Sequence, residues 1–332
     1  MIRQKSDIGK KLLIIHQGAL GDVITTFPAI IKLKEVFQPI HLLCQNQLGK
    51  LSLELDLVQK YFPLESAVFT SLYSGSGDGK VKEILSAYDE VILFSYSAPL
   101  EQRIDRIIKK KVRRIPPRPV ANHRVNVAEH ILKHLIHCGL LDGSKPGDKG
   151  IKPRFVHGEN EDNRSSSKRV LIHPGAGSKD KFWPIANFMI VEKILKSNGM
   201  GPEFILGPAD FFLKTALITE ESHQRRVHTL FDLTALLALL KGAGGFIGND
   251  AGISHLAAFL GVPTVAVFGP SDPQRWHPVG AAVKVIRPDI DCAPCFETEK
   301  PICKEKTCLA LTAPETVMDA FYQVYSHSDL SS

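Results

Sequence analysis

The sequence lacks any apolar run close to the roughly 20 residues that a membrane-spanning helix needs. The apolar patch near its N-terminus, residues 12–15, is four residues long and too short for the core of a signal peptide. We therefore expect no spanning helix and a protein of the cytoplasm. Weak association with an anionic membrane face stays open, because charge attraction needs no spanning helix.

The glycine fingerprint of dinucleotide-binding enzymes is incomplete. Residues 18–23 read Gly-Ala-Leu-Gly-Asp-Val after an apolar run, and the third glycine of the fingerprint is missing. The next apolar run, residues 40–44, leads into Gln45-Asn46 and not into an acidic residue that could hold a ribose. The sequence therefore does not favour a nicotinamide-dependent enzyme.

Aromatic residues are scarce where the positive charge is concentrated. Residues 103–118 read RIDRIIKKKVRRIPPR, within a chain of net charge +6. Such a stretch can attract phosphate-bearing partners. It is short and poor in aromatic residues, so nucleic acid is not the expected partner. The alternative is an amphipathic helix with a solvated basic face, together with a strand edge.

Apolar runs of strand length alternate with amphipathic stretches along most of the chain. Residues 141–168 interrupt this pattern with glycine, proline and a run of serines, a composition typical of a linker. We predict an α/β fold with a first domain over residues 1–150 and a second over 151–332. Each domain should hold a parallel sheet covered on both faces, with a cleft between the domains.

The expected strands are residues 12–15, 40–44, 91–94, 170–173, 203–206, 245–248 and 264–268. The expected helices are residues 23–37, with Pro28 interrupting the first turns, and 125–138, 184–197, 213–221, 232–241 and 313–325.

A polar turn at residues 16–22 follows the first strand. Open α/β sheets bind ligands where strands end and helices begin. Gly18 and Gly21 allow a tight turn there, and Asp22 could take a proton from an attacking hydroxyl. The alternative for Asp22 is a helix N-cap.

A second turn, at residues 173–184, has the chemistry of a phosphate site. Gly175 and Gly177 expose backbone N–H groups, Ser178 adds a hydroxyl, and Lys181 supplies a positive charge suited to a diphosphate. The alternative for Lys181 is a solvated surface lysine. The adjoining Trp183-Pro184 pair should hold the backbone firmly, which favours the phosphate site.

Two further turns follow strands of the second domain. Asp210 could accept hydrogen bonds from a ribose or could equally cap the next helix. The stretch 248–270 places Asp250 and His255 at a helix N-terminus, which suits sugar hydroxyls or phosphate. The alternative is an ordinary strand–helix–strand connection in which Asp250 or Ser254 caps the helix.

Four of the six cysteines cluster near the C-terminus, at Cys292, Cys295, Cys303 and Cys308. Two, seven and four residues separate them, and two close thiol pairs can form a tetrahedral zinc site. The loop between the pairs is shorter than in the commonest zinc motifs. Iron–sulfur ligation and free thiols are the alternatives. A metal with four protein ligands would be structural, because no open position remains for substrate.

Three of these motifs, in this order, resemble glycosyltransferase family 9, the ADP-heptose:lipopolysaccharide heptosyltransferases. They are Gly21-Asp22-Val23 with Pro28, then Lys181-Phe182-Trp183-Pro184, and then residues 249–270. The resemblance covers nearly the whole chain and implies a GT-B fold of two Rossmann-like domains facing a cleft. In this architecture the C-terminal helix can pack back on the N-terminal domain.

The resemblance also implies inverting, metal-independent transfer of a heptose or similar sugar from an ADP-sugar to an anionic, lipid-linked lipopolysaccharide core acceptor. By this resemblance, Asp22 matches the general base of the family, and Lys181 matches a lysine that binds the donor phosphates. Asp250 matches an aspartate near the donor sugar, and the backbone at Ala251-Gly252 contacts the donor. Asp210 is a weaker match to an acidic ribose ligand.

Two departures concern the donor. Ala251 stands where the family often carries Thr or Ser, and Ala176 and Gly177 replace hydroxyl residues in the phosphate turn. The alternatives are therefore another GT-B nucleotide-sugar enzyme, a transferase or an epimerase, and a non-catalytic sugar-binding relative. The presence of both Asp22 and Lys181 argues against the non-catalytic relative.

Overall fold

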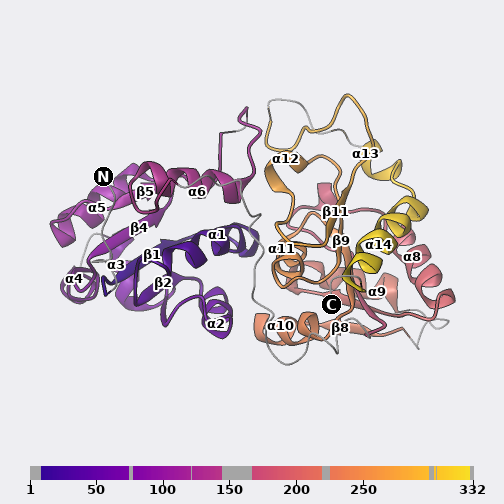
Figure 1. Ribbon diagram of the computed structural model, residues 1–332, viewed down its shortest axis with the longest axis horizontal. Helices are drawn as coiled ribbons and strands as arrows, with labels where there is room; N and C mark the ends of the chain where they lie inside the picture. The colour runs from indigo at the N-terminus through magenta and orange to yellow at the C-terminus, as the bar shows by residue number, and fades with distance from the viewer. Residues whose placement is uncertain are drawn as a thin grey trace. The chain divides into compact units, whose positions relative to one another are not determined.

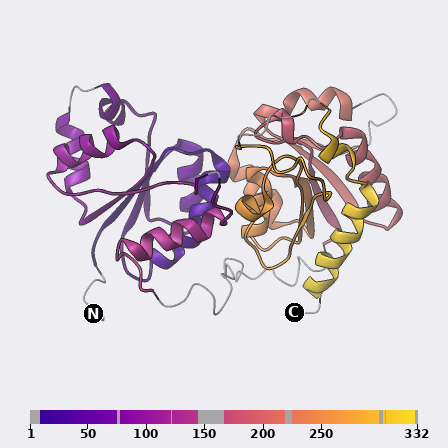
Figure 2. The same cartoon turned by 90° about the horizontal axis from the view of Figure 1, so that it is seen from above.

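The computed structural model describes residues 9–74, 78–120, 122–143, 167–218, 225–298, 303 and 305–329. The chain forms two compact units, the first comprising Met1–Pro119 and Val127–Gly150, the second Val120–Asn126 and Ile151–Ser332 (Figures 1 and 2). This division falls between residues 150 and 151 and assigns residues 120–126 to the second unit. Most of the expected linker, residues 144–166, lies outside the described residues.

The first unit contains a parallel sheet of five strands in the order β3-β2-β1-β4-β5. Helix α1 packs with α6, while α3, α4 and α5 pack with one another, and Figure 2 shows the two groups on opposite faces of the sheet. The strands are β1 Leu12–His16, β2 Ile40–Cys44, β3 Lys60–Pro63, β4 Glu90–Phe94 and β5 Arg113–Ile115. The helices are α1 Leu20–Leu33, α2 Asn46–Glu54, α3 Ala67–Ser74, α4 Asp78–Ser86, α5 Ala98–Ile108 and α6 Val127–His137.

Burial explains why β1 was readily predicted. All five of its residues are buried, as expected for a central parallel strand covered on both faces. Helix α1 begins at Leu20, earlier than predicted, and continues through Pro28 without a break. The predicted interruption at Pro28 is therefore wrong: buried neighbours on the same helix, such as Phe27 and Ile30, pack the helix against the unit.

The second unit contains a parallel sheet of six strands in the order β11-β10-β9-β6-β7-β8. The strands are β6 Arg169–His173, β7 Gly201–Leu206, β8 Val227–Thr229, β9 Gly245–Asn249, β10 Thr264–Val267 and β11 Val283–Ile286. The longer helices are α8 Ile185–Ser197, α10 Leu233–Lys241, α11 Gly252–Phe259 and α14 Pro314–Asp329. The short ones are η2 Lys179–Lys181, η3 Pro208–Leu213, α9 Lys214–Leu217, α12 Pro273–Trp276 and α13 Thr307–Ala310.

The last helix, α14, packs on the second unit itself. It contacts α8, β10 and β11. Its buried residues Val317, Phe321 and Val324 belong to the same core cluster as Trp183 and Phe188. Its apolar face therefore packs within its own unit. Packing of this helix on the N-terminal domain stays a prediction.

Among the described residues, none of the helices combines the length and the apolar character that a membrane crossing requires.

Candidate functional site

In the second unit, four turns follow parallel strands at one edge of the sheet. They come after β6, β7, β9 and β10, and they carry the predicted donor-binding residues. Because all strands run in the same direction, their carboxyl ends share this edge, which is where ligands bind in open α/β sheets.

Lys181 and Asp250 meet at this edge. The Lys181 Nζ lies 2.8 Å from the Asp250 Oδ2, and both side chains are largely buried, at 15% and 5% exposure. The same Nζ lies 4.3 Å from the ring centroid of Phe296, close enough for a cation–π interaction. A solvated surface lysine, the alternative from sequence, is therefore wrong. The structure brings two predicted residues together and adds Phe296, which the sequence did not single out.

Asn249 connects the turns after β6 and β9. Its buried side-chain amide donates to the backbone oxygens of Pro174 (2.7 Å) and Gly175 (3.2 Å), and its oxygen accepts from the N–H of Trp183 (3.2 Å). The Trp183 indole N–H in turn donates to the carbonyl of Thr312 at 3.0 Å. These bonds fix the backbone on both sides of Lys181. Asn249 was part of a predicted motif, but its role needed the tertiary structure.

Asp210 is buried and closely packed on the phosphate turn. Its Oδ2 lies 2.8 Å from the His173 Nε2 and accepts from the N–H of Gly207 at 3.3 Å. A Cβ at Gly175 would lie 2.0 Å from the Asp210 carboxyl carbon, so any other residue there would have to displace the Asp210 side chain. Two roles were considered for Asp210, a ribose contact and a cap of the next helix. The structure contains the bond that supports the cap, from the Gly207 N–H at the start of that helix. A ribose contact stays a prediction.

Helix α11 begins at Gly252 after Ala251, an extended N-cap residue whose side chain cannot cap. The Ser254 hydroxyl donates to the carbonyl of Asn249 at 2.6 Å, and Asp250 faces Lys181. The alternative in which Asp250 or Ser254 caps this helix is therefore wrong. His255 is buried on the first turn of α11.

The remaining residues of the phosphate turn differ in their surroundings. Gly177 is exposed, and a Cβ there would meet no atom within 4 Å. The Ser178 oxygen caps the short helix η2 by accepting from the Asp180 N–H at 3.2 Å. The turn is therefore held by Gly175 and Ser178, whereas Gly177 leaves open space.

In the first unit, Asp22 forms a two-point ion pair with Arg118. The Arg118 Nε lies 2.9 Å from Oδ1, and the second guanidinium nitrogen donates to Oδ2 at 3.1 Å. Oδ2 also accepts from the N–H of Ala19, the N-cap of α1, at 3.2 Å. Asp22 therefore caps the N-terminus of α1 and also forms an ion pair with Arg118. Sequence reasoning treated Arg118 as one cation of a basic stretch, and no local signal links the two residues.

His16 lies beside this pair. Its Nδ1 accepts from the N–H of Gly18 at 3.0 Å. Burial lowers the pKa of His16 from 6.5 to about 4, against an opposing effect of Asp22, and the positive charge of Arg118 lowers it further. The ring is therefore neutral at physiological pH.

The basic stretch 103–118 does not form one continuous basic face. Arg113 pairs with Glu90 and Arg114 with Glu101, as Arg118 does with Asp22. At the other end of the stretch, a hollow of about 360 Å³ is lined by Lys82, Arg103, Arg106 and Ile107. Cations that could attract an anion are gathered at this hollow on α4 and α5.

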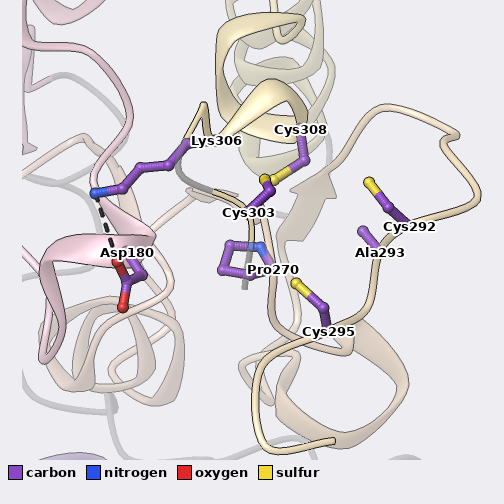
Figure 3. A pocket seen from close by; sticks show the side chains of 8 residues that line it. All are labelled: Asp180, Pro270, Cys292, Ala293, Cys295, Cys303, Lys306 and Cys308. Atoms are coloured by element: carbon purple, nitrogen blue, oxygen red, sulfur yellow. Dashed lines mark ion pairs between the residues drawn. The ribbon is translucent and has the colours of Figure 1, made fainter. Parts of the chain in front are cut away.

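The four clustered cysteines line one small cavity of about 20 Å³ (Figure 3). Cys295 and Cys308 are buried, Cys303 is half-buried and Cys292 is exposed. Burial raises the pKa of the Cys308 thiol, and the other three thiols contribute to the rise. Across the described ranges, no group of three or more His, Cys, Asp or Glu side chains is arranged to hold a metal ion. The cysteines thus share a cavity without a ligating arrangement.

Known proteins resemble the chain over nearly its whole length. Lipooligosaccharide heptosyltransferase 2 of Campylobacter jejuni is 24% identical over 96% of this chain and its own full length. The structure of Escherichia coli ADP-heptose lps heptosyltransferase II superimposes with a TM-score of 0.72 at 18% identity, covering 96% of this chain and 99% of the other. The iron-containing dodecameric glycosyltransferase TibC of enterotoxigenic E. coli gives a TM-score of 0.58 at 15% identity, over 96% and 76% of the two chains.

These solved structures establish a GT-B fold, in agreement with the two parallel sheets and with the prediction from sequence. The model of glycosyltransferase family 9 (heptosyltransferase) matches residues 100–306, more than half of the chain. That range includes Lys181, Asn249 and Asp250, the residues that meet at the sheet edge. The chain therefore belongs to glycosyltransferase family 9, the heptosyltransferase family, and is a glycosyltransferase enzyme.

Proposed function

We propose that this enzyme transfers a heptose or a similar sugar, with inversion, from an ADP-sugar to a saccharide of the lipopolysaccharide core. The observation that carries the proposal is the buried pair of Lys181 and Asp250 at the carboxyl edge of the second sheet. Support for the substrates comes from the family and from relatives named as heptosyltransferases of lipooligosaccharide and lipopolysaccharide.

In this proposal the donor binds along the turns of the second unit. Lys181 contacts the diphosphate, together with backbone N–H groups of residues 175–178 and of Ala251-Gly252 at the start of α11. Asp250 and His255 contact the donor sugar, and Asp210 is placed to approach the ribose. The positive charge of Lys181 and the fixed N–H groups stabilise the charge that grows on the departing diphosphate. The chemical step then needs no metal ion.

Asp22 of the first unit acts as the general base. It accepts the proton of the acceptor hydroxyl while that oxygen attacks the anomeric carbon from the face opposite the diphosphate. The bond from the anomeric carbon to the diphosphate breaks, and inversion follows from this single displacement. The two-point ion pair with Arg118 holds the carboxylate in one orientation before the acceptor arrives.

The acceptor is proposed to be an anionic, lipid-linked saccharide. The hollow lined by Lys82, Arg103 and Arg106 supplies cations that attract phosphate or carboxylate groups. The same cations would favour peripheral attachment at an anionic membrane face, where such an acceptor resides.

The deciding experiment offers the protein a panel of nucleotide sugars with a lipopolysaccharide core acceptor and detects the product by mass spectrometry. The expected result is transfer from an ADP-heptose, with the opposite anomeric configuration in the product. Transfer from another nucleotide sugar would show that the donor is not ADP-heptose. Other donors are included in the panel because Ala251 stands where the family often carries Thr or Ser. Tight binding of acceptor without transfer from any donor would overturn the proposal.

A further inference from the structure

The turns after β6 and β7 are joined by a buried histidine–carboxylate pair, His173 with Asp210. The His173 Nε2 lies 2.8 Å from the Asp210 Oδ2, and the two side chains are only 3% and 6% exposed. His173 is the last residue of β6 and lies directly before the glycines of the phosphate turn, whereas Asp210 lies in η3 after β7. The pair therefore connects two of the four turns that carry the candidate donor site.

Within the described residues, the imidazole of His173 makes no polar contact other than that with Asp210. Its Nδ1 is buried and lacks a hydrogen-bond partner in this part of the chain. A carboxylate oxygen accepts hydrogen bonds, so Nε2 carries the ring proton and donates to Asp210. Burying a ring nitrogen without a partner costs free energy that an apolar side chain of similar size would avoid. The bond to Asp210 is therefore what a histidine supplies at this position.

The two oxygens of the Asp210 carboxylate differ in their partners. Oδ2 accepts from His173 and from the N–H of Gly207 at 3.3 Å, whereas Oδ1 accepts no hydrogen bond from any residue that the structure describes. Gly175 leaves the space that this carboxylate occupies, because a Cβ there would lie 2.1 Å from Oδ1. A carboxylate oxygen without a partner among the described residues therefore lies beside the phosphate turn.

We propose that His173 is a positioning residue of the donor site, and that it holds Asp210 so that Oδ1 accepts a hydrogen bond from a ribose hydroxyl of the donor. The inference rests on the donor site proposed above and adds to it the residue that orients the ribose ligand. His173 is buried and acts through Asp210. The pair then selects ribonucleotides over deoxyribonucleotides, because a nucleotide without the hydroxyl leaves the buried carboxylate oxygen unpaired.

Two donors fix the orientation of the carboxylate before the donor nucleotide binds. One is the His173 ring at the end of β6, and the other is the Gly207 backbone after β7. Together they restrict rotation of the carboxyl group, which lowers the entropic cost of a bond between Oδ1 and the ribose. Without His173, only the longer bond from Gly207 remains to hold the carboxylate.

The experiment compares the dissociation constants of ADP, 2′-deoxy-ADP and 3′-deoxy-ADP, measured by isothermal titration calorimetry with the full-length protein. In wild type, at least one deoxynucleotide should bind about tenfold to a hundredfold more weakly than ADP, the size of a hydrogen bond to a charged group. In His173→Phe this ratio should fall below about threefold, because the carboxylate is no longer held in place. His173→Gln should keep most of the ratio, since its side-chain amide can donate to Oδ2 as Nε2 does.

The matched control is His228→Phe. The His228 Nε2 lies 2.8 Å from Glu203, so this variant removes a histidine–carboxylate pair of the same separation. That pair joins the neighbouring strands β7 and β8 and not the turns at the sheet edge. The ratio in this control should equal that of wild type. Weaker binding of all three nucleotides by His173→Phe, with an unchanged ratio, would show a purely structural role and overturn the inference.

Asp210→Ala provides a second route that does not depend on the folding of His173→Phe. The ratio should fall in Asp210→Ala as well, and adding His173→Phe should not lower it again, because both residues act on the same hydrogen bond. An unchanged ratio in Asp210→Ala would overturn the inference. Wild type that binds no ADP would contradict the proposed donor site and this inference with it. Binding of ADP without discrimination among the three nucleotides would overturn the inference alone.

Discussion

Lys181 and Asp250 face each other at 2.8 Å although they belong to different turns, one after β6 and the other after β9. Asn249, next to Asp250, fixes both turns through its bonds to Pro174, Gly175 and Trp183. Contacts within the protein therefore fix the position of the lysine. A donor diphosphate would compete with Asp250 for the ammonium group or would share it.

Lys181→Ala should weaken donor binding strongly. A charge-assisted contact to phosphate is worth about 1.5–3 kcal/mol, so the dissociation constant for ADP should rise by roughly tenfold to a hundredfold. Isothermal titration calorimetry measures this rise. The matched control is Lys179→Ala, two residues away on the same turn and exposed. Equal affinity in wild type and the Lys181 variant would rule out this contact.

Asp22→Asn should abolish most of the transfer while leaving the donor site intact. Loss of a general base costs about a hundredfold or more in kcat. The dissociation constant for ADP should stay within about twofold of wild type, because Asp22 belongs to the other unit. Steady-state kinetics and calorimetry check the two parts. Turnover near that of wild type would exclude Asp22 as the base. The control is Glu35→Gln, which removes an exposed carboxylate of the same unit and should leave turnover unchanged.

Arg118→Ala should lower kcat without a matching rise in the donor dissociation constant. The variant leaves the buried Asp22 carboxylate without its two-point partner, and misorientation of the base is expected to cost about tenfold or more. Arg118→Lys should restore part of the loss, because it keeps the charge but not the paired geometry. A kcat equal to wild type in the alanine variant would show that the ion pair serves folding alone.

Gly175→Ala should destabilise the second unit, and Gly177→Ala should not. The added Cβ at position 175 would lie 2.0 Å from the Asp210 carboxyl carbon, whereas that at position 177 meets nothing within 4 Å. Overpacking of this kind costs about 1–3 kcal/mol. Thermal unfolding of the two variants provides the comparison. Equal melting temperatures would contradict the close packing of Asp210 on the turn.

The stability of the first unit should fall in acid because of His16. Its folded-state pKa, about 4, lies below the unfolded value of 6.5, so the stabilising effect is complete above pH 6.5 and is lost as the pH falls towards 4. A shift of this size corresponds to about 3 kcal/mol. Denaturant unfolding between pH 7 and 4 should show a smaller loss of unfolding free energy for His16→Gln than for wild type. An identical pH dependence in both proteins would exclude His16 as the cause.

Strand positions were well predicted because central parallel strands are continuously apolar. The predicted strand 40–44 matches β2, and the strands at 12–15, 91–94 and 170–173 differ by one residue from β1, β4 and β6. Edge strands were missed: β3, β8 and β11 are short and incompletely buried, so their sequences lack a continuous apolar run. Helix α12, four residues long, carries no periodic signal of its own.

The candidate donor residues were found because turn chemistry is local. The glycines, Lys181 and Asp250 lie in turns that follow predicted strands, and parallel strands bring such turns to one edge. The pairings depend on packing between distant segments, so the sequence could not supply them. Arg118 reaches Asp22, and Phe296 reaches Lys181, from positions far along the chain.

By itself, the sequence determined the alternation of strands and helices, the polar turns, and the family that these motifs resemble, because each depends on neighbouring residues. The tertiary structure decided which side chains meet: Lys181 with Asp250, Asp22 with Arg118, and Asp210 with His173. It also placed α14 on the second unit and gathered the cysteines around one cavity. Those outcomes are set by how buried surfaces fit together, and no local pattern encodes that fit.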